Sequence, residues 1–287
     1  MNENSPIISV CIPTYNSEST IANCLKSIID QSFLNYEIIV VDGGSSDRTT
    51  EIVKNFGARV INDKNSLLEA RVIGILEARG QFILLLDSDQ ILLQSSLERC
   101  LVQMKDNDML CLGERAAITV STTQKLMNAS KTVSQSNPEK YLNPFSGLLI
   151  PRFFNADLLK LAVRQISPIA LEIVFDRDHQ IIYYEAWKIS KKIKFVDNVL
   201  FHEEPEGFTL LLRKAYRWGY TAGFLRSAHL YDQLLKEKVF IRTMGDGIGS
   251  TLSRTRLVMA ANLITFLKGL PYVFGYLLGF LKGEILG

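Results

Sequence analysis

Residues 81–89 read Gln-Phe-Ile-Leu-Leu-Leu-Asp-Ser-Asp, so a run of five apolar residues ends in two aspartates that a single serine separates. Continuous apolar runs of this length are typical of strands that are buried on both faces of a parallel sheet. Two further runs rich in β-branched residues, at 7–12 and 36–41, also end at proline, glycine or polar residues. We therefore predict three buried strands, each followed by a polar loop.

Stretches with the apolar spacing of helices separate these strands. Residues 19–30 place Ile21, Leu25 and Ile28 on one side, and residues 67–78 also have a helical pattern. The alternation of strands and helices predicts an α/β fold with a mostly parallel central sheet flanked by helices. In such sheets, ligands bind beyond the carboxyl ends of the strands.

Three loops lie at these predicted strand ends, namely Pro13-Thr14-Tyr15-Asn16, Asp42-Gly43-Gly44 and Asp87-Ser88-Asp89. The Asp42 carboxylate can accept hydrogen bonds from a base or a ribose, and Gly43 lets the backbone approach a ligand closely. Asp87 and Asp89 offer the oxygen ligands that suit Mg²⁺ or Mn²⁺, which usually bind one or two carboxylates together with substrate phosphates. The loops lack the Gly-x-Gly-x-x-Gly fingerprint, which argues against a nicotinamide enzyme.

The composition is that of a globular protein, with 47% apolar and 22% charged residues. The four cysteines form no Cys-x-x-Cys pair. We expect them to be buried, reduced thiols in a cytoplasmic setting.

The C-terminal part of the chain is basic and apolar. From Gly207 onward there are 11 Lys and Arg against 4 Asp and Glu, a net charge of +7. Residues 257–281 are long enough to span a bilayer, but glycines, a proline and a lysine interrupt them, so two in-plane helices at about 251–268 and 271–282 fit better. Residues 208–235 have a long helical pattern in which Arg, Lys, Tyr and Trp favour a membrane interface. A buried hairpin or a contact between two copies of the chain is the alternative.

Five stretches resemble glycosyltransferase family 2, whose fold is known as GT-A, in their order and spacing. These stretches are residues 9–16, 38–49, 69–71, 78–80 and 82–89. The resemblance implies a GT-A catalytic domain over residues 1–206. A helical, membrane-associated region over residues 207–287 would follow it.

The resemblance implies a role for each loop residue. The donor-nucleotide pocket would be formed by Pro13, Thr14, Tyr15, Asn16, Asp42, Gly43, Arg71, Asp87 and Ser88. Tyr15 would lie beside the base, and Arg71 near the diphosphate or the ribose. The metal, Mn²⁺ or Mg²⁺, would be bound directly by Asp89, with Asp87 and His202 as further candidate ligands.

Family members also carry a catalytic carboxylate, often in a Glu-Asp pair about two dozen residues before a strand that ends in His. Here the strand predicted before His202 points back to Asp178, in Asp176-Arg177-Asp178. Arg177 stands where the family commonly has Glu, so Asp176 remains a second candidate for the base. Such a base takes the proton of the attacking acceptor hydroxyl.

The sequence thus predicts an inverting glycosyltransferase. It would move a sugar from a nucleotide-sugar donor, with UDP the most frequent nucleotide in the family, to a hydroxyl or lipid-linked phosphate acceptor at the cytoplasmic face of a membrane. We expect no nucleic-acid partner, and a homo-oligomer is left open.

Two alternatives remain. The first is a catalytically silent, membrane-attached protein that binds nucleotide sugars, which the Arg177 substitution favours. The second is a sugar-phosphate nucleotidyltransferase, but such enzymes have a glycine-rich, Arg-containing loop after the first strand, where this chain has Pro13-Thr14-Tyr15-Asn16.

Overall fold

The structure is a computed structural model that describes residues 5–64, 66–116, 135, 137–202, 208–236 and 269–284. Contacts divide the chain into two compact units. The first comprises Met1–Glu114, Ile150–Val174 and Asp178–Glu203, and the second comprises Arg115–Leu149, Phe175–Arg177 and Glu204–Gly287.

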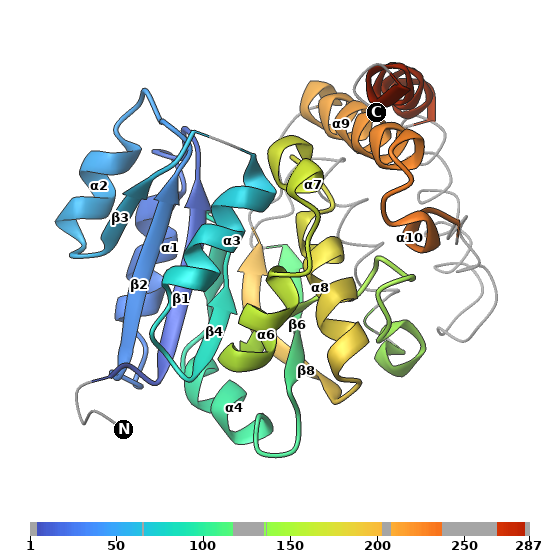
Figure 1. The fold of residues 1–287 in the computed structure, drawn as a ribbon. Coiled ribbons are helices and arrows are strands. Elements are labelled where there is room, and N and C mark those ends of the chain that lie inside the picture. The colour runs from blue at the N-terminus through green and yellow to red at the C-terminus, as the bar shows by residue number, and fades with distance from the viewer. Residues whose placement is uncertain are drawn as a thin grey trace, which may run out of the picture. The chain divides into compact units, whose positions relative to one another are not determined.

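The first unit is built on an eight-stranded sheet with the strand order β3-β2-β1-β4-β7-β6-β8-β5 (Figure 1). Its strands are β1 (Ile8–Thr14), β2 (Tyr36–Asp42), β3 (Arg59–Asn62), β4 (Phe82–Leu85), β5 (Gln90–Leu92), β6 (Met109–Ala116), β7 (Pro151–Asn155) and β8 (Ile193–His202). The strands β1 to β4 pair in parallel, whereas β7 pairs antiparallel with β4 and β6, and β5 pairs antiparallel with β8. The predicted α/β fold with a helix-flanked sheet is confirmed, and the sheet is mixed because its second half is antiparallel.

Helices cover both faces of this sheet. They are α1 (Ile21–Ile29), α2 (Thr49–Asn55), α3 (Leu67–Glu77), α4 (Ser96–Gln103), α6 (Ala156–Val163), α7 (Pro168–Ile173) and α8 (Asp178–Ile189). In Figure 1, α3, α6 and α8 lie in front of the sheet and α1 lies behind it. The helix α3 begins at a capped end, where the Ser66 hydroxyl accepts a hydrogen bond from the Glu69 N–H at 3.1 Å.

The alternation of side chains along β1 explains why both faces need a cover. Ile8, Val10 and Ile12 are buried in the core with the apolar face of α1. Cys11 points to the opposite face, where its thiol donates to the carbonyl oxygen of Gly74 in α3 at 3.2 Å. A Cβ at Gly74 would lie 3.4 Å from the Cys11 Cβ, so glycine lets α3 pack close to the sheet. All four cysteines are buried and free, as predicted.

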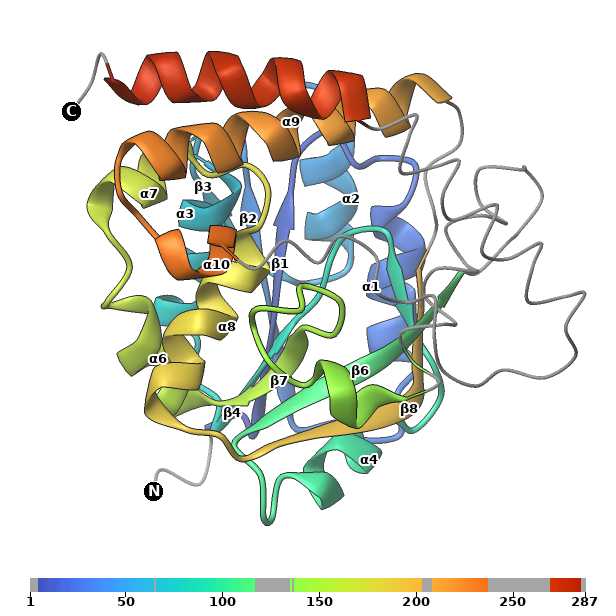
Figure 2. The same cartoon turned by 90° about the vertical axis from the view of Figure 1, so that its right-hand side faces the viewer.

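The second unit contains a 3₁₀ turn (η1, Pro138–Tyr141), α9 (Phe208–Ser227), α10 (Asp232–Lys236) and a helix at residues 269–284. The predicted helix over 208–235 is interrupted after Ser227, where His229 and Tyr231 adopt positive φ angles of 52° and 56°. The predicted in-plane helix at 271–282 corresponds to the helix 269–284, which lies along α9 (Figure 2). The other, at 251–268, lies outside the described residues. In the described part of the chain, no helix is long and apolar enough to cross a membrane.

Gly80, at the turn before β4, offers a test of the packing at the sheet edge. A Cβ at Gly80 would lie 2.6 Å from the backbone nitrogen of Ser9, which β1 holds in place. We expect Gly80→Ala to lower the free energy of unfolding by about 1–3 kcal/mol, because backbone atoms must shift. Urea denaturation followed by circular dichroism measures the change. At Gly269 a Cβ meets no described atom within 4 Å, so Gly269→Ala is the matched control, and an equal effect of both variants would contradict the account.

Candidate active site

The loops after β1 and β2 form a single hydrogen-bonded edge. The parallel register places Thr14 opposite Asp42, and the Thr14 hydroxyl donates to the Asp42 carboxylate at 3.2 Å. The Gly43 N–H donates to the Thr14 carbonyl oxygen at 2.8 Å. Asp42 is buried, and its second carboxylate oxygen accepts from the N–H groups of Gly44 and Ser45 at 3.0 and 2.9 Å. This carboxylate therefore shapes the edge at which a nucleotide is expected.

Tyr15 and Asn16 follow Pro13 and Thr14 at the same edge. The Tyr15 side chain is 65% exposed, so its ring is free to contact a base. Asn16 adopts a positive φ of 48°, and its side-chain oxygen accepts from the Ser46 N–H at 2.9 Å. A Cβ at Gly43 would lie 3.3 Å from the Thr14 carbonyl oxygen. The predicted nucleotide residues of these two loops thus lie together.

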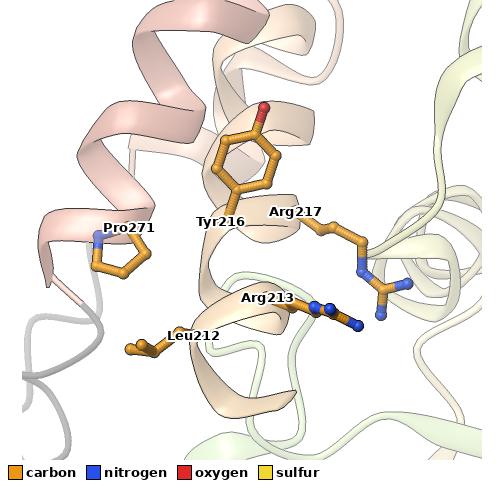
Figure 3. Close-up of a pocket in the computed structure, with 5 residues that line it drawn as sticks. All are labelled: Leu212, Arg213, Tyr216, Arg217 and Pro271. Carbon is orange, nitrogen blue, oxygen red and sulfur yellow. The ribbon is translucent and has the colours of Figure 1, made fainter. Parts of the chain in front are cut away.

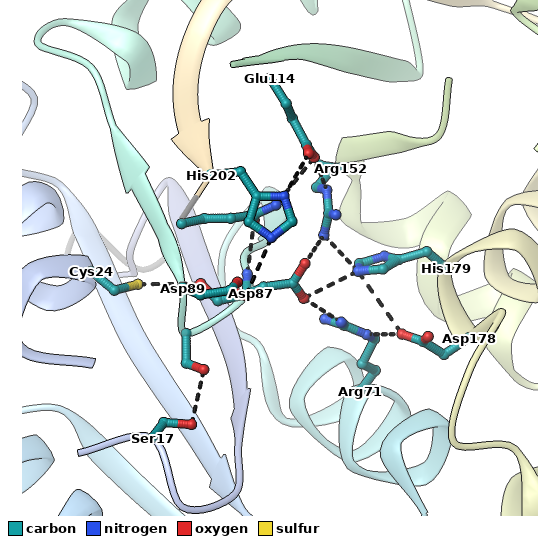
Figure 4. Close-up of polar contacts among 12 residues, drawn as sticks. Ser17, Cys24, Arg71, Asp87, Asp89, Glu114, Arg152, Asp178, His179 and His202 are labelled. Carbon is teal, nitrogen blue, oxygen red and sulfur yellow. Dashed lines mark hydrogen bonds and ion pairs between the residues drawn. The ribbon is translucent and has the colours of Figure 1, made fainter. Parts of the chain in front are cut away.

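Asp87, at the end of β4, is held between two buried arginines (Figure 4). Arg71 of α3 contacts one carboxylate oxygen of Asp87, and Arg152 of β7 contacts the other at 2.9 Å. Burial alone would raise the pKa of Asp87, but the positive charges of Arg152 and Arg71 hold it well below its usual range. Asp87 is therefore a carboxylate whose two oxygens are both paired with cations.

Asp178, the first residue of α8, shares Arg71 with Asp87. The Arg71 guanidinium donates to both carboxylates, and both Arg71 and Asp178 are buried. Burial opposes ionisation, but the Arg71 guanidinium lowers the pKa of Asp178. The neighbouring His179 lies with its Nε2 2.6 Å from an Arg152 nitrogen. Burial, Arg152 and Arg71 lower the pKa of His179, so this ring is neutral at pH 7.

Asp89 belongs to a second group, with His202 and Glu114. The antiparallel register of β5 and β8 places His202 opposite Gln90, and its Nε2 lies 3.2 Å from an Asp89 oxygen. Its Nδ1 lies 3.2 Å from a Glu114 oxygen. Burial lowers the pKa of His202, but the hydrogen bonds to Asp89 and Glu114 outweigh burial and raise it to about 9. This imidazole is therefore a cation in the metal-free protein at neutral pH.

The predicted metal ligands divide between these two groups. Asp87 faces the arginines, whereas Asp89 faces His202. In the described ranges, no group of three or more His, Cys, Asp or Glu side chains is arranged to hold a metal ion. The Oδ1 atom of Asp89 is buried without a hydrogen-bond partner. Such an oxygen fits a hard divalent cation that takes one protein carboxylate and completes its shell with phosphate oxygens and water.

The two candidates for the base lie in different surroundings. Asp178 joins the network of Arg71 and Asp87, whereas Asp176 belongs to the second unit and pairs there with Arg217 of α9 at 3.1 Å. Between them, Arg177 adopts a positive φ of 66°. Ser88 donates from its hydroxyl to the Ser17 hydroxyl oxygen at 3.0 Å, which ties the Asp87–Asp89 turn to the loop after β1.

Three residues of the network were not predicted from the sequence: Glu114, Arg152 and His179. Arg152 links them, since it contacts Glu114 at 3.0 Å as well as Asp87 and His179. The register of β6 and β7 places Arg152 at the irregularity between Leu110 and Cys111, so its long side chain reaches Glu114 without direct strand pairing, and no motif marks this contact. The only signal in the sequence is a charged residue beside an apolar strand, in Cys111-Leu112-Gly113-Glu114 and in Pro151-Arg152-Phe153.

Comparison with known proteins decides the family. The family model described as glycosyl transferase family 2 matches residues 9–156, just over half of the 287-residue chain. The chain belongs to this family. This is the family that the sequence resembles.

Curated relatives match parts of the chain. The glycosyltransferase GlyG of Streptococcus pneumoniae is 34% identical over 111 residues, which cover 36% of this chain and 37% of GlyG. The putative glycosyltransferase EpsH of Bacillus subtilis is 26% identical over 209 residues, which cover 69% of this chain and 60% of EpsH. The chain thus spans less than two thirds of the length of either relative.

Solved structures have the same fold. The mannosyltransferase PcManGT from Pyrobaculum calidifontis, in complex with GDP-Man and Mn²⁺, is similar with a TM-score of 0.58 and 15% identity, over 98% of this chain and 88% of that chain. Residues 1–349 of TarS from S. aureus, in complex with UDP, are similar with a TM-score of 0.54 and 18% identity, over 98% and 92% of the two chains. At these identities the likeness shows a shared fold.

The raised pKa of His202 predicts how stability depends on pH. Below the ordinary histidine pKa of about 6.5, the ring is protonated in the folded and unfolded protein, so the contacts with Asp89 and Glu114 contribute fully. As the pH rises towards 9 this contribution is lost, because only the folded form still holds the proton. We expect the stability difference between the wild type and His202→Gln to shrink by up to about 3 kcal/mol over this range. Urea unfolding with a chelator present measures it, and a pH-independent difference would contradict the pairing.

Proposed function

We propose that this family 2 glycosyltransferase transfers a sugar, with inversion, from a UDP-sugar to an acceptor hydroxyl or lipid-linked phosphate. The observation that carries the proposal is the buried network in which Arg71 joins the carboxylates of Asp87 and Asp178. One arginine thereby connects a residue at the proposed donor edge of the sheet with the residue proposed as the base.

The loops after β1 and β2 support nucleotide binding. Their exposed Tyr15 ring and the backbone at Gly43 can contact a base and ribose, while Asp42 holds the loops in place. Pro13, Asn16 and Ser88 complete the proposed donor pocket. TarS binds UDP, and the P. calidifontis enzyme binds GDP-Man. UDP is proposed here because it is the most frequent donor nucleotide of the family.

Asp89 is proposed to hold Mn²⁺ or Mg²⁺ through its unpartnered buried oxygen, with His202 beside it. Bound there, the ion supplies positive charge that stabilises the leaving nucleoside diphosphate. Asp87, whose oxygens pair with arginines, is proposed to contact the ribose and to orient Arg71 and Arg152. The P. calidifontis structure contains Mn²⁺, which supports a divalent ion for this chain as well.

Asp178 is proposed as the base of a single displacement. Its lowered pKa keeps it ionised, so it can accept the acceptor's proton. The acceptor oxygen forms a bond to the anomeric carbon. The bond from that carbon to the diphosphate oxygen breaks, and the nucleoside diphosphate leaves with the electron pair. Attack opposite to the leaving group inverts the anomeric configuration.

Through Arg71, binding of the nucleotide-sugar donor would raise the pKa of Asp178. Without donor, its charge is shared between Asp87 and Asp178. A diphosphate beside Arg71 would accept hydrogen bonds from the same guanidinium N–H groups that now contact Asp87 and Asp178. It would also bring negative charge near Asp178. Both effects raise the pKa of Asp178 towards a more useful value for a base. The donor thereby makes Asp178 a stronger base for the acceptor.

The acceptor is proposed to be reached at the cytoplasmic face of a membrane. The catalytic region, residues 1–206, would act there, and the basic region, residues 207–287, would provide the attachment. The 11 Lys and Arg of this region outnumber its 4 Asp and Glu, and the resulting positive charge suits anionic lipid surfaces. A second copy of the chain is the other partner that this region could bind.

Asp178→Asn tests the assignment of the base. We expect UDP release from a panel of UDP-sugars, with Mn²⁺ and a lipid extract, to fall by about 10²–10⁴-fold because the proton acceptor is lost. UDP binding, measured by calorimetry, should persist. The matched control is Asp176→Asn, which removes an ion pair with the largely exposed Arg217 and should change the rate by less than about fivefold.

A greater loss in Asp176→Asn than in Asp178→Asn would reverse the assignment. UDP binding by the wild type without sugar transfer to any acceptor would instead favour a catalytically silent binding protein.

Asp89→Asn tests the metal site. We expect Mn²⁺-dependent UDP release to fall about hundredfold or more, since the charge that stabilises the diphosphate is lost. Titration with Mn²⁺ and UDP should show weaker coupling between the two ligands. Asp197→Asn, an exposed aspartate on β8, is the matched control. Full wild-type activity in the presence of a chelator would remove the metal from the mechanism.

A further inference from the structure

The helix 269–284 exposes a continuous apolar stripe. Six large apolar side chains at helical spacing are exposed on it, namely Leu270, Val273, Phe274, Leu277, Leu278 and Leu281. Leu270 is 83% exposed and Phe274 is 61% exposed. The stripe extends over twelve residues, or about 18 Å of helix. We propose that this stripe is the surface through which the chain lies in the interface of an anionic lipid bilayer. The proposal deepens the proposed function by assigning its membrane contact to named residues.

The opposite face of the helix is already occupied. Gly275, Gly279 and Gly283 are buried. A Cβ at Gly275 or Gly279 would collide with the carbonyl oxygen of Tyr216 or Tyr220 in α9. On the α9 side, a Cβ at Gly219 or at Gly223 would likewise collide with backbone of the helix 269–284. Small residues on both helices thus permit close backbone packing, which fixes the direction in which the stripe faces.

The distribution of polar residues favours lipid over a protein partner. Between positions 270 and 281, every exposed residue of this helix is apolar, and the exposed charges, Lys282 and Glu284, follow the stripe at its C-terminal end. Specific protein interfaces carry polar contacts around an apolar centre, which this stripe lacks along its length. An amphipathic helix with one broad apolar face is typical of elements that lie in the plane of a bilayer.

Aromatic and basic residues of α9 accompany the stripe. The Tyr216 ring lies 6.2 Å from the Phe274 ring, and Lys282 lies 5.9 Å from the Tyr220 ring centre. Leu212, Arg213, Tyr216, Arg217 and Pro271 line a cavity of about 510 Å³. Figure 3 shows the guanidinium groups of Arg213 and Arg217 pointing the same way from α9. Tyrosine and cations at such a border suit the headgroup layer and its phosphates.

The test is flotation of the full-length protein with vesicles, in the absence of donor and metal. We expect the wild type to float with vesicles of phosphatidylcholine and phosphatidylglycerol, and more weakly with phosphatidylcholine alone. The double variant Leu277→Asp/Leu281→Asp should lose roughly hundredfold in partitioning, since two leucine side chains no longer enter the interface. Leu34→Asp/Leu161→Asp changes two exposed leucines of the first unit and is the matched control, which should float like the wild type.

A second variant tests the electrostatic contribution to vesicle binding. Arg213→Gln should reduce the preference for phosphatidylglycerol about fivefold and leave binding to phosphatidylcholine unchanged. Unchanged flotation of Leu277→Asp/Leu281→Asp would overturn the proposal. A wild-type dimer in light scattering that this variant dissociates, without vesicle binding, would overturn it in favour of a second copy of the chain.

The experiment separates this proposal from the proposed function. Flotation needs neither donor nor acceptor, so its failure leaves the transferase assignment intact. Conversely, UDP release from UDP-sugars without vesicles should be equal in the wild type and in Leu277→Asp/Leu281→Asp. If this variant releases UDP as fast as the wild type but no longer floats with vesicles, the stripe contacts the membrane and takes no part in catalysis.

Discussion

The Asp87 carboxylate and the two arginines beside it are the interaction on which the site depends. Arg71 and Arg152 are almost completely buried, at 4% and 8% exposed, and a buried guanidinium is tolerable only when it is paired. Their carboxylate partners come from the turn after β4, from β6 and from α8, so the pairing requires α3 and β7 to lie where they do. Removing one partner would leave a buried charge, which typically costs several kcal/mol. Fold and site therefore support each other at this point.

The same network decides which side chains of the site are charged. Arg152 and Arg71 lower the pKa of Asp87, and Arg71 lowers that of Asp178, so both stay ionised, whereas burial and the two arginines lower the pKa of His179 and keep it neutral. Two carboxylates keep His202 protonated. A divalent ion at Asp89 would meet that imidazolium, so binding of the metal and release of the His202 proton are linked. Cations therefore stand on both sides of the turn at which a diphosphate would be bound.

The second unit relies on a different physical principle. The helices α9 and 269–284 pack through glycines whose backbones approach closely, and contacts such as Tyr216–Phe274 lie beside these glycines. This arrangement leaves the large apolar side chains of the stripe exposed on the other side of the helix 269–284. Glycine recurs every fourth residue in this helix, at 275, 279 and 283. This spacing places all three glycines on the face that packs against α9 and leaves the apolar stripe on the other.

The sequence predicted the strand-and-helix order of the first ninety residues, because apolar runs and helical spacing are local signals. It also predicted which loops meet, since parallel strands end at one edge, and its resemblance to the family pointed to Asp178 as the base, with Asp176 as the second candidate. It did not determine the antiparallel half of the sheet, the break after Ser227 or the roles of Glu114 and Arg152. Arg71 and Asp178 are 107 positions apart, and the Arg152 side chain reaches Asp87 because β7 pairs with β4. Only the tertiary structure decides such contacts, because they depend on how distant elements pack and not on any local pattern.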